Sequence, residues 1–214
     1  MTHGIIGRWT YATRVFAMSA EDLLKPLEQA IATHLIPALT SQSSPSEATR
    51  DLLALSVRFG GLGLVNPTKW SIHQQKLSVM ACQPLTELIV RQEGDVAKAT
   101  AKQRTIKRQW KIQHQAEQKK EAETIIAGLP LHQQKCALLA QEKGSSSWLG
   151  AIPIERLGFT LHKGAFRDAL CLRYCWNIQL APPKCRCGAE FEVNHVLTCR
   201  QGGYHSIRHN EHFG

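Results

Sequence analysis

The sequence has no long apolar run and no apolar segment near its start. No stretch approaches the ~18 consecutive apolar residues of a membrane-spanning helix. The first residues, MTHGIIGRW, lack the apolar core of a secretory signal. We therefore expect an intracellular protein with no membrane partner. In a reducing compartment, clustered cysteines are typical of metal sites rather than of disulfides.

Acidic residues are scarce as well. The 214 residues include 26 Lys and Arg against 17 Asp and Glu, which gives a net charge of +9 and a pI near 9.4. Such an excess of positive charge favours a polyanionic partner, most commonly nucleic acid. Hydrophobic residues make up 43% and charged residues 20% of the chain, a composition that excludes a disordered protein.

Strand signals are weak, and apolar spacing predicts a mainly α protein. Leu24, Leu27, Ile31 and Leu35 recur at three- and four-residue intervals and would form one face of a helix. Pro26 lies inside this run. It predicts either a kink or a helix that begins after the proline.

A second helix is predicted from a start signal at Ser44, with Pro45 at its first position and Glu47 at its third. Gly60 and Gly61 are predicted to end it, because either glycine can adopt the left-handed conformation of a helix terminus.

A third helix is predicted from Asn66 and Pro67, a cap followed by a first-position proline, through roughly Met80. The glycines before it, Gly60-Gly61-x-Gly63, have no Lys-Ser/Thr and follow no clear strand. We interpret them as a turn rather than as a phosphate loop.

The longest predicted helix covers residues 96–127 and is rich in bases. Its bases from 97 to 120 are Lys98, Lys102, Arg104, Lys107, Arg108, Lys111, Lys119 and Lys120, with Glu117 as the only acid. Apolar positions are few, so a broad face cannot be buried. The helix is predicted either to be a connector that crosses solvent between two parts of the protein or to lie along a phosphate backbone. A solvated charged helix is the alternative, although such helices usually mix both signs.

Three thiols and one imidazole near the C-terminus form a complete tetrahedral ligand set. They are Cys185, Cys187, His195 and Cys199, spaced C-x-C-x7-H-x3-C. The set predicts a structural zinc site, because four protein ligands leave no open position for water. A module of this size has almost no core, so the metal would supply much of its folding free energy. The spacing is tighter than the usual Cys-x2–4-Cys, and His205 or His209 could replace a ligand.

Residues 144–147 predict a flexible break, and residues 164–174 predict another helix. Cys171 and Cys175 are interpreted as core cysteines of that helix. A weaker alternative pairs one of them with His162 as nucleophile and base.

Two sets of residues resemble non-LTR retrotransposon proteins of the class that carries a restriction-like endonuclease. The C-terminal set is Phe166-x2-Ala169-x2-Leu172-Arg173, Pro182-Pro183, Cys185-x-Cys187, Asn194-His195, Cys199, Gly202-Gly203 and Arg208-His209-Asn210. The N-terminal set is Gly7-Arg8-Trp9-Thr10-Tyr11-x2-Arg14, Pro26-Leu27-Glu28, Leu35-Ile36-Pro37 and Arg58-Phe59-Gly60-Gly61-Leu62-Gly63-Leu64. The first set resembles the zinc knuckle of that family, and the second resembles the helical thumb that follows a reverse transcriptase palm.

The resemblance implies four parts. These are a thumb-like helical domain over 1–95, a basic helical linker over 96–143, a helical segment over 144–183, and the zinc knuckle with a truncated tail over 184–214. The parent would be an RNA-directed DNA polymerase with an endonuclease, acting in the nucleus. The chain has no Asp-Asp pair for the two metal ions of such a polymerase. We therefore expect no catalytic residue here, and expect Mg²⁺ only in the absent catalytic domains.

The function expected from these observations is to grip template-primer or target DNA, with RNA and DNA as partners and no small-molecule substrate. The expected contacts are Arg8, Arg14, Lys98, Lys102, Arg104, Lys107, Arg108, Lys111, Arg186, Arg200 and Arg208. The alternative is a zinc-containing protein-interaction module whose long helix binds an acidic partner.

Overall fold

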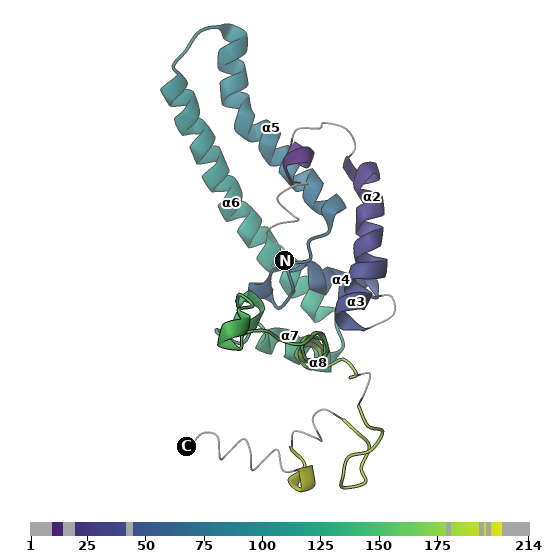
Figure 1. Ribbon diagram of the computed structural model, residues 1–214. Helices are drawn as coiled ribbons and strands as arrows, with labels where there is room; N and C mark the ends of the chain where they lie inside the picture. Colours follow the sequence, from purple (N-terminus) through teal and green to yellow (C-terminus); the bar gives the residue numbers. More distant parts are fainter. Residues whose placement is uncertain are drawn as a thin grey trace. The chain divides into compact units, whose positions relative to one another are not determined.

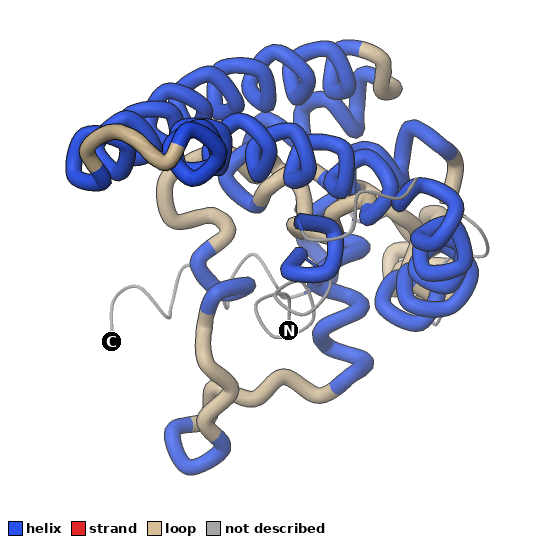
Figure 2. The backbone as a smooth tube through the Cα atoms, turned by 90° about the horizontal axis from the view of Figure 1, so that it is seen from above, coloured by secondary structure: helices blue, strands red, loops and turns tan. Residues whose placement is uncertain are grey.

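The computed structural model describes residues 10–14, 20–41, 45–178, 181–192, 195 and 198–202. Within these ranges the chain is helical with connecting loops and contains no strand, as the tube in Figure 2 shows. The prediction of a mainly α protein is confirmed. Two of the expected nucleic-acid contacts, Arg8 and Arg208, lie outside the described residues, as do His205 and His209.

The chain divides into two compact units, Met1–Gly150 and Ala151–Gly214. The boundary expected at residue 95 falls inside the first unit, between two helices that pack on each other. Among the helices of the described residues, none is long and apolar enough to cross a membrane.

After a short helical stretch at residues 10–14, the first unit continues with a helical run in three parts. Helix α2 (Ala20–Ala30) continues into a π-helical segment (Ile31–Leu35) and then into α3 (Ile36–Thr40). Pro26 lies inside α2, so the alternative in which the helix begins after the proline is wrong. At the end of the π segment the Ile36 N–H donates to the carbonyl of Ile31, five residues back, an arrangement that occurs mostly as a single widened turn within α-helices.

Helix α4 (Glu47–Ala54) begins later than predicted. Its N-cap is Ser46, whose side-chain oxygen accepts the Thr49 N–H at 3.2 Å. The predicted start at Ser44, with Pro45 in the first turn, is therefore wrong. Two serines flank Pro45, and the second one takes the extended backbone that a cap requires.

The glycines after α4 shape a turn instead of ending the helix directly. Helix α4 ends at Ala54, a 3-10 turn follows (Val57–Phe59), and Gly60 caps that turn at φ 87°. A side chain on Gly61 would collide with the backbone carbonyl of Leu55. The interpretation of this segment as turn chemistry is consistent with these contacts, but the predicted helix end was several residues too late.

Helices α5 (Pro67–Arg91) and α6 (Val96–Ala127) form a long antiparallel hairpin, drawn side by side in Figure 1. Asn66 caps α5 by accepting two backbone N–H groups, and Asp95 caps α6 in the same way. The predicted end of α5 near Met80 is wrong. Packing against α6 and α2 carries the helix past Pro84, which is buried.

The remaining helices are short. Helix α7 (Leu131–Leu139) completes the first unit, with a 3-10 turn at Ser147–Gly150. The second unit contains a 3-10 turn (Glu155–Leu157), helix α8 (Lys163–Tyr174) and a last 3-10 turn (Arg200–Gly202). Leu170, Cys171 and Tyr174 on α8 are buried. The expected core role of Cys171 is confirmed, and burial raises the pKa of its thiol, as expected for an unreactive buried cysteine. The same expectation for Cys175 is wrong, because Cys175 is half-buried and caps the end of α8 with a left-handed backbone at φ 53°.

Candidate metal centre and basic helix

The Cys-x-Cys pair lies in a tight turn of the second unit. The backbone carbonyl of Cys185 accepts the Gly188 N–H at 2.9 Å, and the Cys185 N–H donates to the carbonyl of Ala189 at 2.9 Å. A bridge between Lys184 and Glu190 flanks the turn. Gly188 has φ 89°, which favours glycine. This geometry allows thiols only two residues apart to approach the same point.

All four predicted ligands come together. One ligand atom from each of Cys185, Cys187, His195 and Cys199 lies within 4.8 Å of the other three. The Cys185 and Cys199 sulfurs are 3.7 Å apart, and the Cys187 sulfur lies 3.0 Å from His195 Nε2. Around a tetrahedral ion with ordinary ligand bonds, two sulfurs are about 3.8 Å apart, and a sulfur and a nitrogen about 3.5 Å. These two pairs are therefore within about half an ångström of the tetrahedral spacing, and the group as a whole could hold a metal ion.

Without a cation, the surroundings of the cluster keep the Cys187 thiol protonated. The Ala189 N–H donates to the Cys187 sulfur and lowers the thiol pKa, but desolvation and the neighbouring thiols of Cys199 and Cys185 outweigh it. The net pKa of Cys187 is raised. Three thiols this close oppose one another's ionisation. A bound cation reverses this balance, because metal ligation requires thiolates.

Exposure differs among the four ligands. Cys199 is buried, Cys185 and His195 are half-buried, and Cys187 is exposed. Arg186 lies within the turn and Arg200 follows Cys199 directly, and both are exposed. The cluster therefore carries positive charge at its surface.

The basic helix of the sequence is α6, and its bounds match the predicted range of 96–127. A narrow seam of half-buried residues includes Ile106, Trp110 and His114. The expected contacts Lys98, Lys102, Arg104, Lys107, Arg108 and Lys111 are all exposed. Among the described residues, none of these six lies within ion-pair distance of a carboxylate.

Arg14 lies elsewhere in the same unit. Its Nε donates to Gln74 Oε1 of α5 at 2.8 Å, and its carbonyl accepts the Ser78 hydroxyl at 3.2 Å. The structure therefore gives Arg14 a part in packing against α5.

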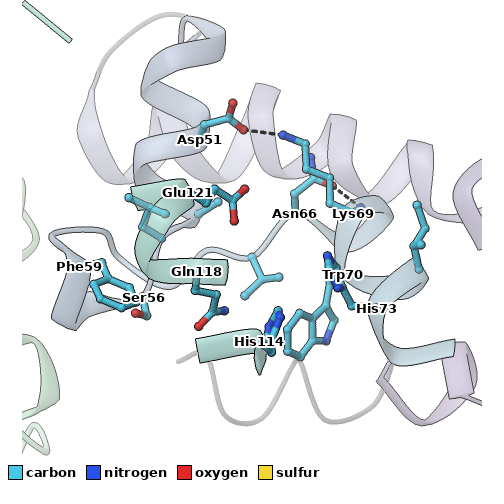
Figure 3. A pocket seen from close by; sticks show the side chains of 14 residues that line it. Asp51, Ser56, Phe59, Asn66, Lys69, Trp70, His73, His114, Gln118 and Glu121 are labelled. Atoms are coloured by element: carbon cyan, nitrogen blue, oxygen red, sulfur yellow. Dashed lines mark hydrogen bonds and ion pairs between the residues drawn. The ribbon is translucent and has the colours of Figure 1, made fainter. Parts of the chain in front are cut away.

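A cavity at the base of the hairpin was not expected from the sequence. It has a volume of about 280 Å³ and is lined by residues of α4, α5, α6 and the loops between α4 and α5 (Figure 3). The ring centroid of His114 lies 5.8 Å from that of Trp70 and 5.0 Å from that of His73. Desolvation, followed by the nearby His73, lowers the pKa of His114 against the opposing effect of Glu117 and Glu121. Only the pairing of α5 with α6 brings His114 to the other two rings, so the signal in the sequence was limited to Trp70 and His73, which lie three residues apart on α5.

No protein-family model matches this chain, and neither a curated protein nor a solved structure shows significant similarity to it.

Proposed function

We propose that this chain is a nucleic-acid-binding part of a retroelement RNA-directed DNA polymerase and endonuclease, with α6 as its main contact surface. The observation that carries the proposal is the run of six exposed bases from Lys98 to Lys111, none of which pairs with a described carboxylate. Clustered like charges create a potential that attracts a polyanion and speeds its association.

The dimensions of α6 suit a phosphate backbone. The segment from Lys98 to Lys111 spans roughly 20 Å at the rise of an α-helix. Duplex DNA carries one phosphate charge per about 1.7 Å of its axis. The six basic side chains are exposed, so several of them can reach phosphates while the half-buried seam stays covered. Such contacts position a duplex but carry little sequence information.

The proposed ion in the Cys3His cluster is zinc in a structural role. Cys185, Cys187, His195 and Cys199 would hold it, and four protein ligands leave no position for a reacting water. Zinc would fix the turn that presents Arg186 and the segment that presents Arg200. Both arginines would then contact target DNA beside the zinc.

The retroelement assignment is supported by the motifs at both ends of the chain and by the helical first unit, which suits a thumb. In this proposal RNA and DNA are the partners, the protein acts in the nucleus, and this part catalyses no reaction. The palm and the nuclease would belong to the parent protein.

Charge reversal on α6 tests the proposal. The double variant Lys102→Glu, Lys107→Glu should bind a duplex about tenfold to a hundredfold more weakly than wild type at moderate salt, because it replaces two phosphate contacts by repulsion. The matched control is Lys135→Glu, an exposed change on α7, which should bind within about twofold of wild type. Equal binding by wild type and the double variant would contradict the proposal.

A second function, a zinc-containing protein-interaction module, is favoured by one observation. Helix α5 exposes apolar side chains along the hairpin, among them Val79 at 65% and Val90 at 76%. A protein partner of the hairpin would cover them. In that case Val79→Ser and Val90→Ser would abolish partner capture and leave nucleic-acid binding unchanged.

A further inference from the structure

The cavity at the base of the hairpin has polar atoms that the protein leaves without hydrogen bonds. The Ser56 hydroxyl, the Trp70 indole N–H and both ring nitrogens of His114 are inaccessible to solvent and have no hydrogen-bond partner among the described residues. All three residues line the same cavity. Buried polar atoms are nearly always paired in folded proteins, so three residues with unpaired polar atoms around one cavity make it a candidate site for a ligand that supplies partners.

The shape of the lining favours a flat ligand. Rings of Phe59, Trp70, His73 and His114 surround the cavity, and Figure 3 shows the indole of Trp70 beside the imidazole of His114. Ring faces such as these form stacking platforms for a planar group. The volume of about 280 Å³ accommodates one heterocycle together with water.

The charges of the lining argue against a phosphate in this place. The cation in the lining, Lys69, lies 2.9 Å from Asp51, and this hydrogen bond raises the pKa of Lys69. Its charge is therefore already neutralised by the protein. Glu121 adds a negative charge to the lining that would repel an anion. The site suits a neutral group with hydrogen-bond donors at its edge.

From this convergence we infer that the cavity binds one unstacked nucleobase of a single strand whose phosphates follow α6. The inference rests on the proposed function and extends it from contacts with the phosphate backbone to a contact with a nucleobase. Ser56 and the Trp70 N–H would pair with acceptors on the base, and Glu121 would accept from an exocyclic amine. A carboxylate pairs in this way with amino-bearing bases, so adenine, cytosine and guanine should bind better than uracil.

The position of the cavity along α6 supports this reading. His114 lies less than one helical turn beyond Lys111, the last of the six exposed bases. Trp110 lies one helical turn before His114, and the ammonium group of Lys76 on α5 lies 5.9 Å from the centroid of the Trp110 ring. A strand bound along the basic residues of α6 would therefore lie within one helical turn of His114, which lines the cavity.

The test compares single strands with and without bases. Probes of about twelve nucleotides, a common site size for single-strand binding, would be an RNA, a DNA and an abasic DNA backbone of equal length. Wild type should bind the strands that carry bases about tenfold more tightly than the abasic one, in line with stacking of one base. Trp70→Phe keeps a smaller aromatic ring and removes the N–H, and Ser56→Ala removes a hydroxyl that caps no helix. Both should reduce the difference to about threefold or less.

The control is Gln115→Ala, an exposed change on α6, which should keep the tenfold difference. Comparison of RNA with DNA identifies the polymer, and adenosine alone serves as the probe for a free nucleoside. If all strands bind equally with steep salt dependence, the cavity holds water only, and the inference is overturned while the proposed function stands. If adenosine binds and no strand does, the cavity assignment stands and the proposed function fails.

Discussion

The guanidinium of Arg50 and the carboxylate of Glu28 form a two-pronged ion pair between α4 and α2. Arg50 Nε and Nη2 each lie 2.7 Å from a Glu28 oxygen, and Nη1 donates to the carbonyl of Leu64 at 2.7 Å. The Arg50 side chain is only 8% exposed. One buried side chain thus ties two helices and the loop before α5 together.

Removing one partner of this pair should destabilise the first unit strongly. Glu28→Ala leaves the Arg50 charge buried without its carboxylate, and we expect a loss of about 3–5 kcal/mol in the free energy of unfolding. Urea denaturation followed by circular dichroism measures it. The exposed pair of Lys25 and Asp22 supplies the control, because Asp22→Ala should cost about 1 kcal/mol or less. Equal losses for the two variants would show that the buried pair has no special role.

Gly61 should tolerate no side chain. A Cβ there would meet the carbonyl oxygens of Leu55 and Leu52, which are backbone atoms and cannot rotate away. We expect Gly61→Ala to lower the free energy of unfolding by about 2 kcal/mol or more. Gly128→Ala is the matched control, because its Cβ would make only ordinary contacts at 3.5 and 3.7 Å. A thermal melt in which both variants match wild type would contradict the contact.

Helix α6 shows what the sequence could predict and why. Its bounds followed from local signals, since the chain from Val96 to Ala127 contains neither glycine nor proline and Asp95 provides a cap. The four metal ligands were equally local, because all lie within fifteen residues. The end of α5 was missed because packing, rather than local sequence, carries the helix past Pro84. The cavity was missed because Ser56, Trp70 and His114 belong to three separate segments that meet only in the folded chain.

His114 should make the first unit less stable in acid. Desolvation and His73 lower its pKa below the ordinary value of 6.5, so the unfolded chain binds the proton more readily than the folded one. Its stabilising effect is therefore complete above pH 6.5 and is lost as the pH falls through the lowered folded pKa. His114→Gln should reduce the difference in unfolding free energy between pH 7 and pH 5. Equal pH dependence in wild type and variant would show that His114 ionises freely in the folded protein.

The metal ion should be zinc, at one equivalent per chain. Elemental analysis of the purified protein measures the stoichiometry. Cys187→Ser should lose the metal and order in the second unit, because the ion supplies much of the folding free energy of so small a module. Cys82→Ser, an exposed cysteine on α5, should retain the full equivalent. A wild-type protein purified without chelators that carries no zinc would contradict the assignment.

The most direct test of the central claim, that α6 binds a phosphate backbone through its exposed bases, is the salt dependence of affinity for a DNA duplex. Each phosphate contact contributes a slope of about −0.9 to the logarithm of the binding constant against that of the salt concentration. We expect a wild-type slope of roughly −4 to −6, and a slope shallower by about 2 for Lys102→Ala, Lys107→Ala. A wild-type affinity that does not change with salt, or an unchanged slope in the double variant, would contradict the account.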